Sequence, residues 1–250
     1  IINLTTHITA DLTGKKILIT AGGTREPIDS VRVIANRSSG KQGYAVAAEA
    51  ASRGADVTLI STVELAVPAG VRLVNVETAA QMQAAIDAVW ATSDVMVMSA
   101  AVADFRPVSC ATQKIKKDGG IPQIVLEATP DILAGLGASK RPDQVLVGFA
   151  AETSDLVANA QSKLERKNLD LIVANDVSQP GVGFAHDTNA VTFLRPSQAL
   201  ESVSLTDKRA VARALPPPRS PWRWKAWGIP TIRSMTAPGR NGARSRTRPS

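Results

Sequence analysis

The chain has 250 residues, of which 44% are hydrophobic, so it is long enough for one sizeable α/β domain or for two small ones. It has no apolar run near the roughly 20 residues that a membrane-spanning helix needs and no N-terminal signal pattern, so we expect a cytoplasmic protein without membrane contacts. The single cysteine excludes an internal disulfide, and the two isolated histidines, His7 and His186, lack the spacing of a metal site.

The net charge of +7 comes from the C-terminal segment 216–250. This segment contains eight basic residues and no acidic ones, which leaves 21 of the 29 basic residues against 22 acidic residues in 1–215. It also holds three of the four tryptophans and seven of the fifteen prolines, a composition that predicts a separate, disordered extension. Two alternatives stay open for this tail: it contacts nucleic acid, or it is a non-native C-terminus. We expect no nucleic acid partner for residues 1–215.

The first part of the chain predicts a linker, a strand and an unusually delayed helix. Residues 1–13 are polar and aperiodic, which indicates a linker. The apolar run 15–20, followed by Gly22 and Gly23, predicts a buried strand and a tight turn. A stretch over 25–35 then separates this strand from the glycine-bearing turn Asn36–Gly43, and a helix is predicted only from Tyr44 to Arg53.

The rest of the chain alternates between apolar strands and helical segments. We predict one helix from Thr129, with Thr129 as its cap and Pro130 at its first helical position, and a last short helix from Thr206. The other predicted helices cover 78–90 and 154–167, and the predicted strands cover 56–61, 71–76, 94–101, 123–127, 144–152, 169–174, 190–195 and 199–205. This alternation predicts an α/β fold with a doubly wound, mostly parallel, Rossmann-like sheet and a small β flap.

In a doubly wound sheet, ligands bind at the C-terminal ends of the strands. The turn Asn36–Gly43 lies at such an end, and its Ser38, Ser39 and Gly40 precede a helix whose first N–H groups have no partner within the helix. These groups suit a phosphate, although an ordinary serine-capped helix start remains an alternative.

Two enzyme classes fit the sequence poorly. A nicotinamide dehydrogenase would need a G-x-G-x-x-G turn, a carboxylate after the second strand, and a lysine four residues after Tyr44, where the chain has Ala48. A thiol or serine hydrolase would need a histidine near Cys110 or a nucleophile elbow, and neither is present.

A nucleoside triphosphate that is bound without a P-loop lysine fits better. Lys114, Lys116 and Lys117 lie on a glycine-flanked segment where they can clamp phosphates, and Asp104 follows a strand where it can hold Mg²⁺. Taken singly, the lysines also fit a solvated edge and Asp104 also fits a turn.

Six ordered motifs in 11–213 together resemble one known family. They are Ala21–Asp29, Val31–Gly43, Ala100–Phe105, Lys114–Lys117, Val147–Thr153 and Arg166–Val177. This set resembles the bacterial phosphopantothenate–cysteine ligases, the synthetase half of the bifunctional coenzyme A biosynthesis protein. The resemblance implies that residues 14–215 form a CTP-dependent ligase domain.

By this resemblance, CTP and 4′-phosphopantothenate give an acyl-cytidylate and pyrophosphate, and L-cysteine then displaces CMP. The implied catalytic residues are Asn36 and Arg32, for the acyl-cytidylate and its attack by cysteine, and Lys114, for the departing pyrophosphate. The nucleotide-binding residues implied by the resemblance are Met98, Ser99, Ala100, Asp104, Lys114, Pro130, Asp131, Ile132, Leu133, Phe149, Lys163 and Lys167. The strand-end position adds Gly22, Gly23, Ser38, Ser39 and Gly40 as candidates.

The resemblance also implies cofactors and partners. We expect Mg²⁺ with CTP at Asp104, a homodimer, and a flavin-dependent decarboxylase domain upstream in the full-length protein, with no flavin site in this chain. The chain departs from the family after Thr206, where the tail from Pro216 replaces the last helix. A catalytically inactive nucleotide-binding module therefore stays open as a second hypothesis.

Overall fold

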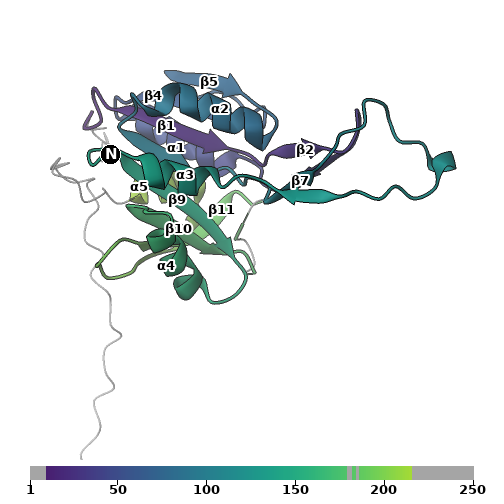
Figure 1. Ribbon diagram of the computed structural model, residues 1–250. Helices are drawn as coiled ribbons and strands as arrows, with labels where there is room; N and C mark the ends of the chain where they lie inside the picture. The colour runs from purple at the N-terminus through teal and green to yellow at the C-terminus, as the bar shows by residue number, and fades with distance from the viewer. Residues whose placement is uncertain (1–9, 179–181, 184–185, 216–250) are drawn as a thin grey trace, which may run out of the picture.

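The computed structural model describes residues 10–178, 182–183 and 186–215, which form an eight-stranded sheet with helices on both faces (Figure 1). The strand order is β12-β11-β10-β9-β6-β1-β4-β5. The six strands from β10 to β5 are parallel, whereas β11 and β12 are added in antiparallel pairs. The predicted doubly wound, mostly parallel sheet is confirmed.

The sheet strands are β1 (Lys16–Ala21), β4 (Asp56–Ser61), β5 (Val71–Asn75), β6 (Val95–Met98), β9 (Val145–Glu152), β10 (Leu171–Asp176), β11 (Thr188–Leu194) and β12 (Glu201–Asp207). The helices are α1 (Lys41–Ser52), α2 (Ala79–Trp90), α3 (Ile132–Ser139), α4 (Leu156–Arg166) and α5 (Lys208–Ala214). None of the helices within the described part of the chain is long and apolar enough to cross a membrane.

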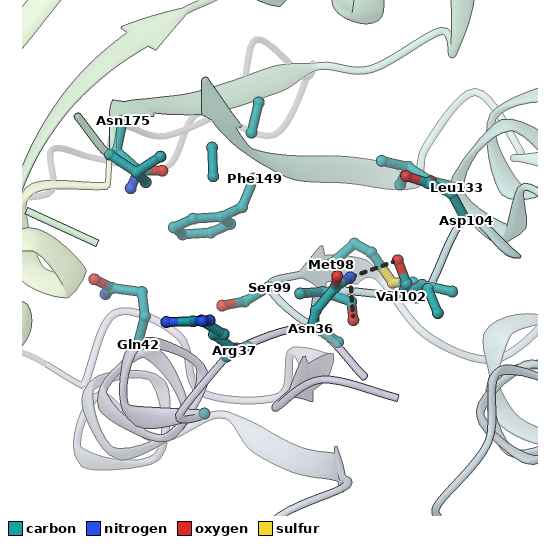
Figure 2. A pocket seen from close by; sticks show the side chains of 18 of the residues that line it. Asn36, Arg37, Gln42, Met98, Ser99, Val102, Asp104, Leu133, Phe149 and Asn175 are labelled. Carbon is teal, nitrogen blue, oxygen red and sulfur yellow. Dashed lines mark hydrogen bonds between the residues drawn. The ribbon is translucent and has the colours of Figure 1, made fainter. Parts of the chain in front are cut away.

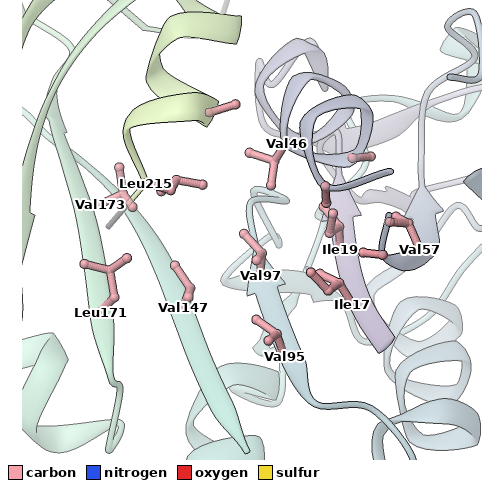
Figure 3. Packing of buried hydrophobic residues seen from close by; sticks show 14 of the residues in the cluster. Ile17, Ile19, Val46, Val57, Val95, Val97, Val147, Leu171, Val173 and Leu215 are labelled. Carbon is pink, nitrogen blue, oxygen red and sulfur yellow. The ribbon is translucent and has the colours of Figure 1, made fainter. Parts of the chain in front are cut away.

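Two apolar layers hold the sheet, because the central strands are buried on both faces. On one face, α1 and α5 pack over β1, β6 and β9, where Val46 and Leu215 lie above Val97 and Val147 (Figure 3). On the other face, α2, α3 and α4 form a second layer that includes Met82. These layers fix the relative positions of the strand ends, where the site is found.

Three helix starts differ from their predicted positions. Helix α1 begins at Lys41, and its N-cap is Gly40, in the left-handed conformation and without a side-chain capping bond, so the serine-capped alternative is wrong. Thr129 does not cap α3, because Asp131 does so by accepting a hydrogen bond from the Ala134 amide at 3.0 Å. The last helix is capped by Asp207, since Thr206 still belongs to β12.

A long arm projects from the sheet at the ends of β1 and β6 (Figure 1). It consists of two antiparallel pairs, β2 (Arg25–Pro27) with β3 (Val33–Ala35) and β7 (Phe105–Pro107) with β8 (Leu126–Ala128). The stretch over 25–35 thus forms part of the small β flap. The strand predicted over 123–127 is displaced toward β8, and the strand predicted to run to 101 ends at Met98.

The predicted terminal segments lie largely outside the described residues. This holds for 1–9 and for the whole tail 216–250. Within 10–13 of the predicted linker, the structure places Leu12 fully buried in the core and pairs Asp11 with Arg53. This part of the segment therefore packs on the domain.

The contact between α1 and β1 generates a prediction about stability. A Cβ added at Gly43 would lie 2.7 Å from the Thr20 carbonyl oxygen and 2.7 Å from the Ala21 Cβ. Because this overpacks a buried contact, we expect Gly43→Ala to cost about 1–3 kcal/mol of unfolding free energy and to lower the melting temperature by about 2–10 °C.

The matched control is Gly135→Ala in α3, where an added Cβ meets no atom within 4 Å. Alanine is favoured over glycine within helices by about 0.5–1 kcal/mol, so this variant should melt at or above the wild-type temperature. Thermal unfolding followed by circular dichroism measures both, and an unchanged melting temperature for Gly43→Ala would refute the packing argument.

Candidate active site

A pocket of about 710 Å³ opens at the C-terminal ends of β6 and β9 (Figure 2). Its walls come from the turn before α1, the loop after β6, the start of α3, β9, α4 and the segment around β11. Fifteen of the predicted site residues line it: Asn36, Ser38, Ser39, Gly40, Met98, Ser99, Ala100, Asp104, Pro130, Asp131, Ile132, Leu133, Phe149, Lys163 and Lys167. The four others, Gly22, Gly23, Arg32 and Lys114, do not line it.

The two glycines after β1 lie beneath the pocket and not in its wall. Gly22 has a φ of 90°, and a Cβ there would lie 2.1 Å from the Thr62 hydroxyl oxygen. A Cβ at Gly23 would lie 2.7 Å from the carbonyl oxygen of Asn36. Gly23 therefore lets the turn before α1 approach the end of β1 closely, and Gly22 leaves room for Thr62 after β4.

Asn36 connects this turn to the loop after β6. Its Nδ2 donates hydrogen bonds to the carbonyl oxygens of Ala101 at 3.3 Å and Val102 at 3.1 Å (Figure 2). The same loop is held from below by the Thr20 hydroxyl, which accepts from the Ala100 amide at 3.1 Å. The side chain of Asn36 thus has a fixed orientation beside the segment that follows Met98.

Two ion pairs organise the end of the pocket at α3 and α4. The Lys167 ammonium lies 2.8 Å from Asp131, and the Lys163 ammonium lies 2.6 Å from Glu152. Burial acts to raise the pKa of Asp131, but the hydrogen bonds from Lys167 and from the Ala134 amide outweigh it, so the pKa lies below its usual value. Asp131 is therefore ionised at neutral pH and holds Lys167 at the pocket.

Asp104 is the candidate ligand for Mg²⁺. It is exposed at the pocket, and no group of three potential metal-ligating side chains occurs among the described residues. A single carboxylate fits Mg²⁺ that is bound mainly by substrate phosphates, because Mg²⁺ keeps several waters and often takes one or two protein carboxylates. The donor set suits a metal that arrives with a nucleotide.

Arg32 and Lys114 belong to the arm, and the buried carboxylate of Asp29 links the two segments. Its Oδ1 accepts from the amides of Val31 and Arg32, both at 2.8 Å. Its Oδ2 accepts from the Arg32 guanidinium, including Nε at 2.9 Å, and from the Ile115 amide at 3.1 Å. The Arg32 guanidinium also donates to the Ile115 carbonyl at 3.0 Å. Asp29 therefore ties Arg32 to the residue next to Lys114.

These bonds keep the Asp29 carboxylate ionised. The hydrogen bond from Arg32 lowers the pKa of Asp29 far below its usual range. Burial acts in the opposite direction, and the hydrogen bonds from three backbone amides add to the lowering. A lowered pKa in the folded state stabilises the fold above the unfolded-state pKa of about 3.9. This contribution is lost as the pH falls below that value.

Some lining residues were not identified from the sequence. They are mainly polar and include Arg37, Lys41, Gln42, Asn175, Asn189 and Lys208. Arg37, Lys41 and Gln42 belong to the recognised turn, and Asn175 lies near the C-terminal end of β10, so strand-end position was an available signal. Asn189 lies in β11 and Lys208 in α5. The alternation of strands and helices in the sequence does not predict that these two elements contact the pocket.

Comparison with known proteins identifies relatives of the chain. Residues 12–217 match the family described as the DNA/pantothenate metabolism flavoprotein C-terminal domain. The coenzyme A biosynthesis bifunctional protein CoaBC of Mycobacterium bovis is 53% identical over 191 residues, which are 72% of this chain and 46% of that protein. A cysteine/cysteine sulfinic acid decarboxylase from an unknown prokaryotic organism is 44% identical over 203 residues, covering 80% of this chain and 56% of that protein.

The chain thus spans about half the length of the curated relatives it matches. Among solved structures, the crystal structure of the C-terminal domain of CoaBC is similar with a TM-score of 0.70 and 42% sequence identity. That match covers 82% of this chain and 93% of the other.

The Asp29 contacts predict a local effect of Asp29→Asn. The asparagine oxygen can still accept from the turn amides, but the new NH₂ group cannot accept from Arg32 or Ile115. Because hydrogen bonds to charged groups contribute about 1.5–3 kcal/mol, exchange of the Ile115 amide proton should accelerate on the order of tenfold or more. Hydrogen exchange measured by NMR tests this.

The control is Asp143→Asn, an exposed carboxylate that pairs with Arg141 away from the arm. It should leave exchange at Ile115 unchanged. Equal protection of Ile115 in wild type and Asp29→Asn would show that Asp29 does not hold the two segments of the arm together.

Proposed function

The chain belongs to the family of DNA/pantothenate metabolism flavoprotein C-terminal domains, and from this membership we propose that it is a CTP-dependent phosphopantothenate–cysteine ligase in coenzyme A biosynthesis. The observation that carries the proposal is the gathering of motif residues from distant parts of the chain around one pocket. Asn36, Asp104, Phe149 and Lys163 lie in different motifs and all line it.

The proposed reaction has two steps in this pocket. In the first, a carboxylate oxygen of 4′-phosphopantothenate attacks the α-phosphorus of CTP, and pyrophosphate leaves with the electrons of the broken P–O bond. In the second, the amino nitrogen of L-cysteine attacks the acyl carbon, CMP leaves, and the nitrogen loses its proton to solvent. The products are 4′-phosphopantothenoyl-L-cysteine, CMP and pyrophosphate.

The pocket residues divide between these steps. Donors at the start of α1 and from Ser38 face the phosphates, and lysines at the α4 end face the nucleoside. Asn36 is proposed to orient the acyl-cytidylate. Since its amide protons bond to the carbonyls of Ala101 and Val102, it also fixes the loop against which this intermediate would lie. Mg²⁺ bound with CTP at Asp104 would neutralise phosphate charge.

Arg32 and Lys114 are proposed to act in the pocket of a second copy of the chain. They lie on the arm, which projects from the sheet (Figure 1), and neither lines the pocket of its own chain. The arm also exposes several large apolar side chains, which are common at protein–protein interfaces. These are Val31, Phe105, Val108, Ile121, Val125 and Leu126, with exposed fractions of 45–97%. A homodimer formed through the arms would cover them and complete each site.

The wider setting is also a proposal. We place the chain as the C-terminal half of a cytoplasmic bifunctional protein with a flavin-dependent decarboxylase half upstream. The names of the two relatives, one bifunctional and one a decarboxylase, support this arrangement because the chain covers only 46% and 56% of their lengths.

Product analysis tests the proposed activity. With CTP, 4′-phosphopantothenate and Mg²⁺, the protein should release pyrophosphate, and the cysteine amide and CMP should appear only when L-cysteine is added. A catalytically inactive nucleotide-binding module would bind CTP without releasing pyrophosphate. No turnover with any nucleotide, or a preference for a nicotinamide cofactor, would contradict the enzyme assignment.

Asn36→Asp is predicted to separate the two steps. A carboxylate replaces the amide that bonds to the loop after β6, and its negative charge opposes the negative charge that builds on the acyl oxygen during attack by cysteine. We expect the acyl-cytidylate to form and accumulate, while amide formation falls at least about 100-fold, because charge effects in a transition state are of this order. Chromatography of the nucleotide products measures this, and normal amide formation would remove the proposed role of Asn36.

Lys114→Gln is predicted to slow the first step. It removes a positive charge that is proposed to stabilise the departing pyrophosphate, so pyrophosphate release should fall roughly 100-fold or more. Lys117→Gln on the same segment is the comparison, and it should have a smaller effect. If Lys114→Gln released pyrophosphate at the wild-type rate, a different residue would have to fill this role.

A further inference from the structure

Thr24 is a fully buried residue to which the proposed reaction gives no role. It lies between β1 and β2, at the point where the arm leaves the sheet (Figure 1). The residue is 0% exposed and does not line the pocket, so its hydroxyl acts on neighbouring parts of the chain and not on a substrate.

The hydroxyl of Thr24 holds one peptide group in the loop after β6. Its Oγ1 accepts a hydrogen bond from the Ala103 amide at 2.9 Å. The backbone amide of Thr24 also donates to the Ala101 carbonyl oxygen at 3.2 Å, so the residue contacts this loop twice. Ala103 is only 5% exposed, and a buried N–H group without an acceptor is costly. The hydroxyl therefore fixes the direction in which the Ala103 N–H group points.

The same peptide group is bonded to Asn36 on its other side. The Ala103 N–H and the Val102 carbonyl belong to one planar peptide, in which they point in opposite directions. The Val102 carbonyl accepts from Nδ2 of Asn36 at 3.1 Å (Figure 2). A continuous chain of hydrogen bonds thus runs from the Thr24 hydroxyl through the 102–103 peptide to the Asn36 side chain. Hydrogen bonds in such a chain polarise and strengthen one another.

This chain determines how the amide of Asn36 is turned toward the pocket. Both partners of the Asn36 amide are carbonyl oxygens, those of Ala101 and Val102, so its NH₂ group faces the loop and Oδ1 faces away from it. If the 102–103 peptide rotated, the Val102 carbonyl would leave Asn36 and the amide would lose an acceptor. Thr24 opposes this rotation, because the Ala103 N–H would leave its own acceptor at the same time.

Asp104, the next residue of the loop, is held in another way. Its carbonyl oxygen accepts from the amide of Thr129, directly after β8, at 2.9 Å. The pairing of β7 with β8 begins with the next residue, Phe105, opposite Ala128. Loss of the Thr24 hydroxyl should therefore disturb Asn36 more than Asp104, the candidate Mg²⁺ ligand.

We propose that Thr24 is a positioning residue for the second step of the reaction and acts on Asn36 through the 102–103 peptide. Its hydroxyl keeps this peptide in the orientation that holds the Asn36 amide ready for the acyl-cytidylate. The inference rests on the proposed function, because it concerns the role given there to Asn36.

Thr24→Val tests this role, because valine has the shape of threonine without the hydroxyl. Quenched-flow analysis of the products should show pyrophosphate release changed by less than about twofold, while amide formation slows on the order of tenfold, as expected for one lost buried hydrogen bond. The acyl-cytidylate should accumulate, and Thr24→Ser should restore the wild-type ratio of the two steps. Equal slowing of both steps, or amide formation at the wild-type rate, would overturn the proposal.

Thr62→Val is the matched control. Thr62 is also buried, with an exposed fraction of 6%, and its hydroxyl donates to the Gly23 carbonyl at 2.8 Å, which is not part of the 102–103 peptide. This variant should lose stability as Thr24→Val does but leave the ratio of the two steps unchanged.

A double variant tests whether Thr24 acts through Asn36. Residues that act through one contact have non-additive effects, so Thr24→Val combined with Asn36→Asp should form the amide within about twofold of the rate of Asn36→Asp alone. Losses that multiply in the double variant would show that Thr24 acts by another route, which would overturn the proposal.

NMR provides a test that does not depend on turnover. In the wild type, the Ala103 amide proton should exchange on the order of 100-fold or more slowly than that of Ile121, which is 97% exposed. Thr24→Val should accelerate this exchange and shift the side-chain NH₂ signals of Asn36, whereas Thr62→Val should do neither.

These measurements separate the two levels of the argument. Rapid exchange of Ala103 in the wild type would overturn the role of Thr24 even if Thr24→Val did not fold. An active wild type with unchanged Asn36 signals in Thr24→Val would refute the role of Thr24 alone. A wild type that forms no amide would refute the proposed function as well.

Discussion

The close approach of the first turn of α1 to the end of β1 is the constraint on which the site depends. Gly43 lets the helix touch the Thr20 carbonyl, and Gly22 and Gly23 leave room for Thr62 and the Asn36 backbone. A side chain at Gly43 would push α1 away from β1, one at Gly23 would push the turn at Asn36 away, and one at Gly22 would clash with Thr62 after β4. Because the helix start supplies one wall of the pocket, the close packing at Gly23 and Gly43 determines where that wall lies.

A second constraint links the two segments of the arm to each other. Asp29 is fully buried as a side chain and accepts hydrogen bonds from both arm segments, so Arg32 and the lysine-bearing segment move together. Both candidate catalytic cations are thereby absent from the pocket that their own chain forms. In the proposed homodimer, one arm would bring both cations to the site of the neighbouring chain.

The layered parallel sheet could be predicted from the sequence. The continuous apolar runs of β1 and β6 require burial on both faces, which only a layered parallel sheet provides. The cap of α3 could not be assigned, because Thr129 and Asp131 are both good N-caps. The structure also pairs Asp131 with Lys167, 36 positions away, a contact that the local sequence does not reveal. The positions of Asn189 and Lys208 at the pocket could not be predicted either. They result from the antiparallel pairing of β11 and β12, which brings α5 against α1.

The two ends of the pocket differ in the groups that pair with their lysines. At the α3 end, Glu152 pairs with Lys163 and Asp131 pairs with Lys167, so these two lysines add little net charge to the pocket. At the α1 end, the buried Lys208 has carbonyl partners and no carboxylate bonded to it among the described residues. The lysines at the α3 end are therefore paired with carboxylates, whereas the buried Lys208 is held by backbone carbonyl groups. In the proposed reaction, Asn36 would orient the acyl-cytidylate during attack by cysteine.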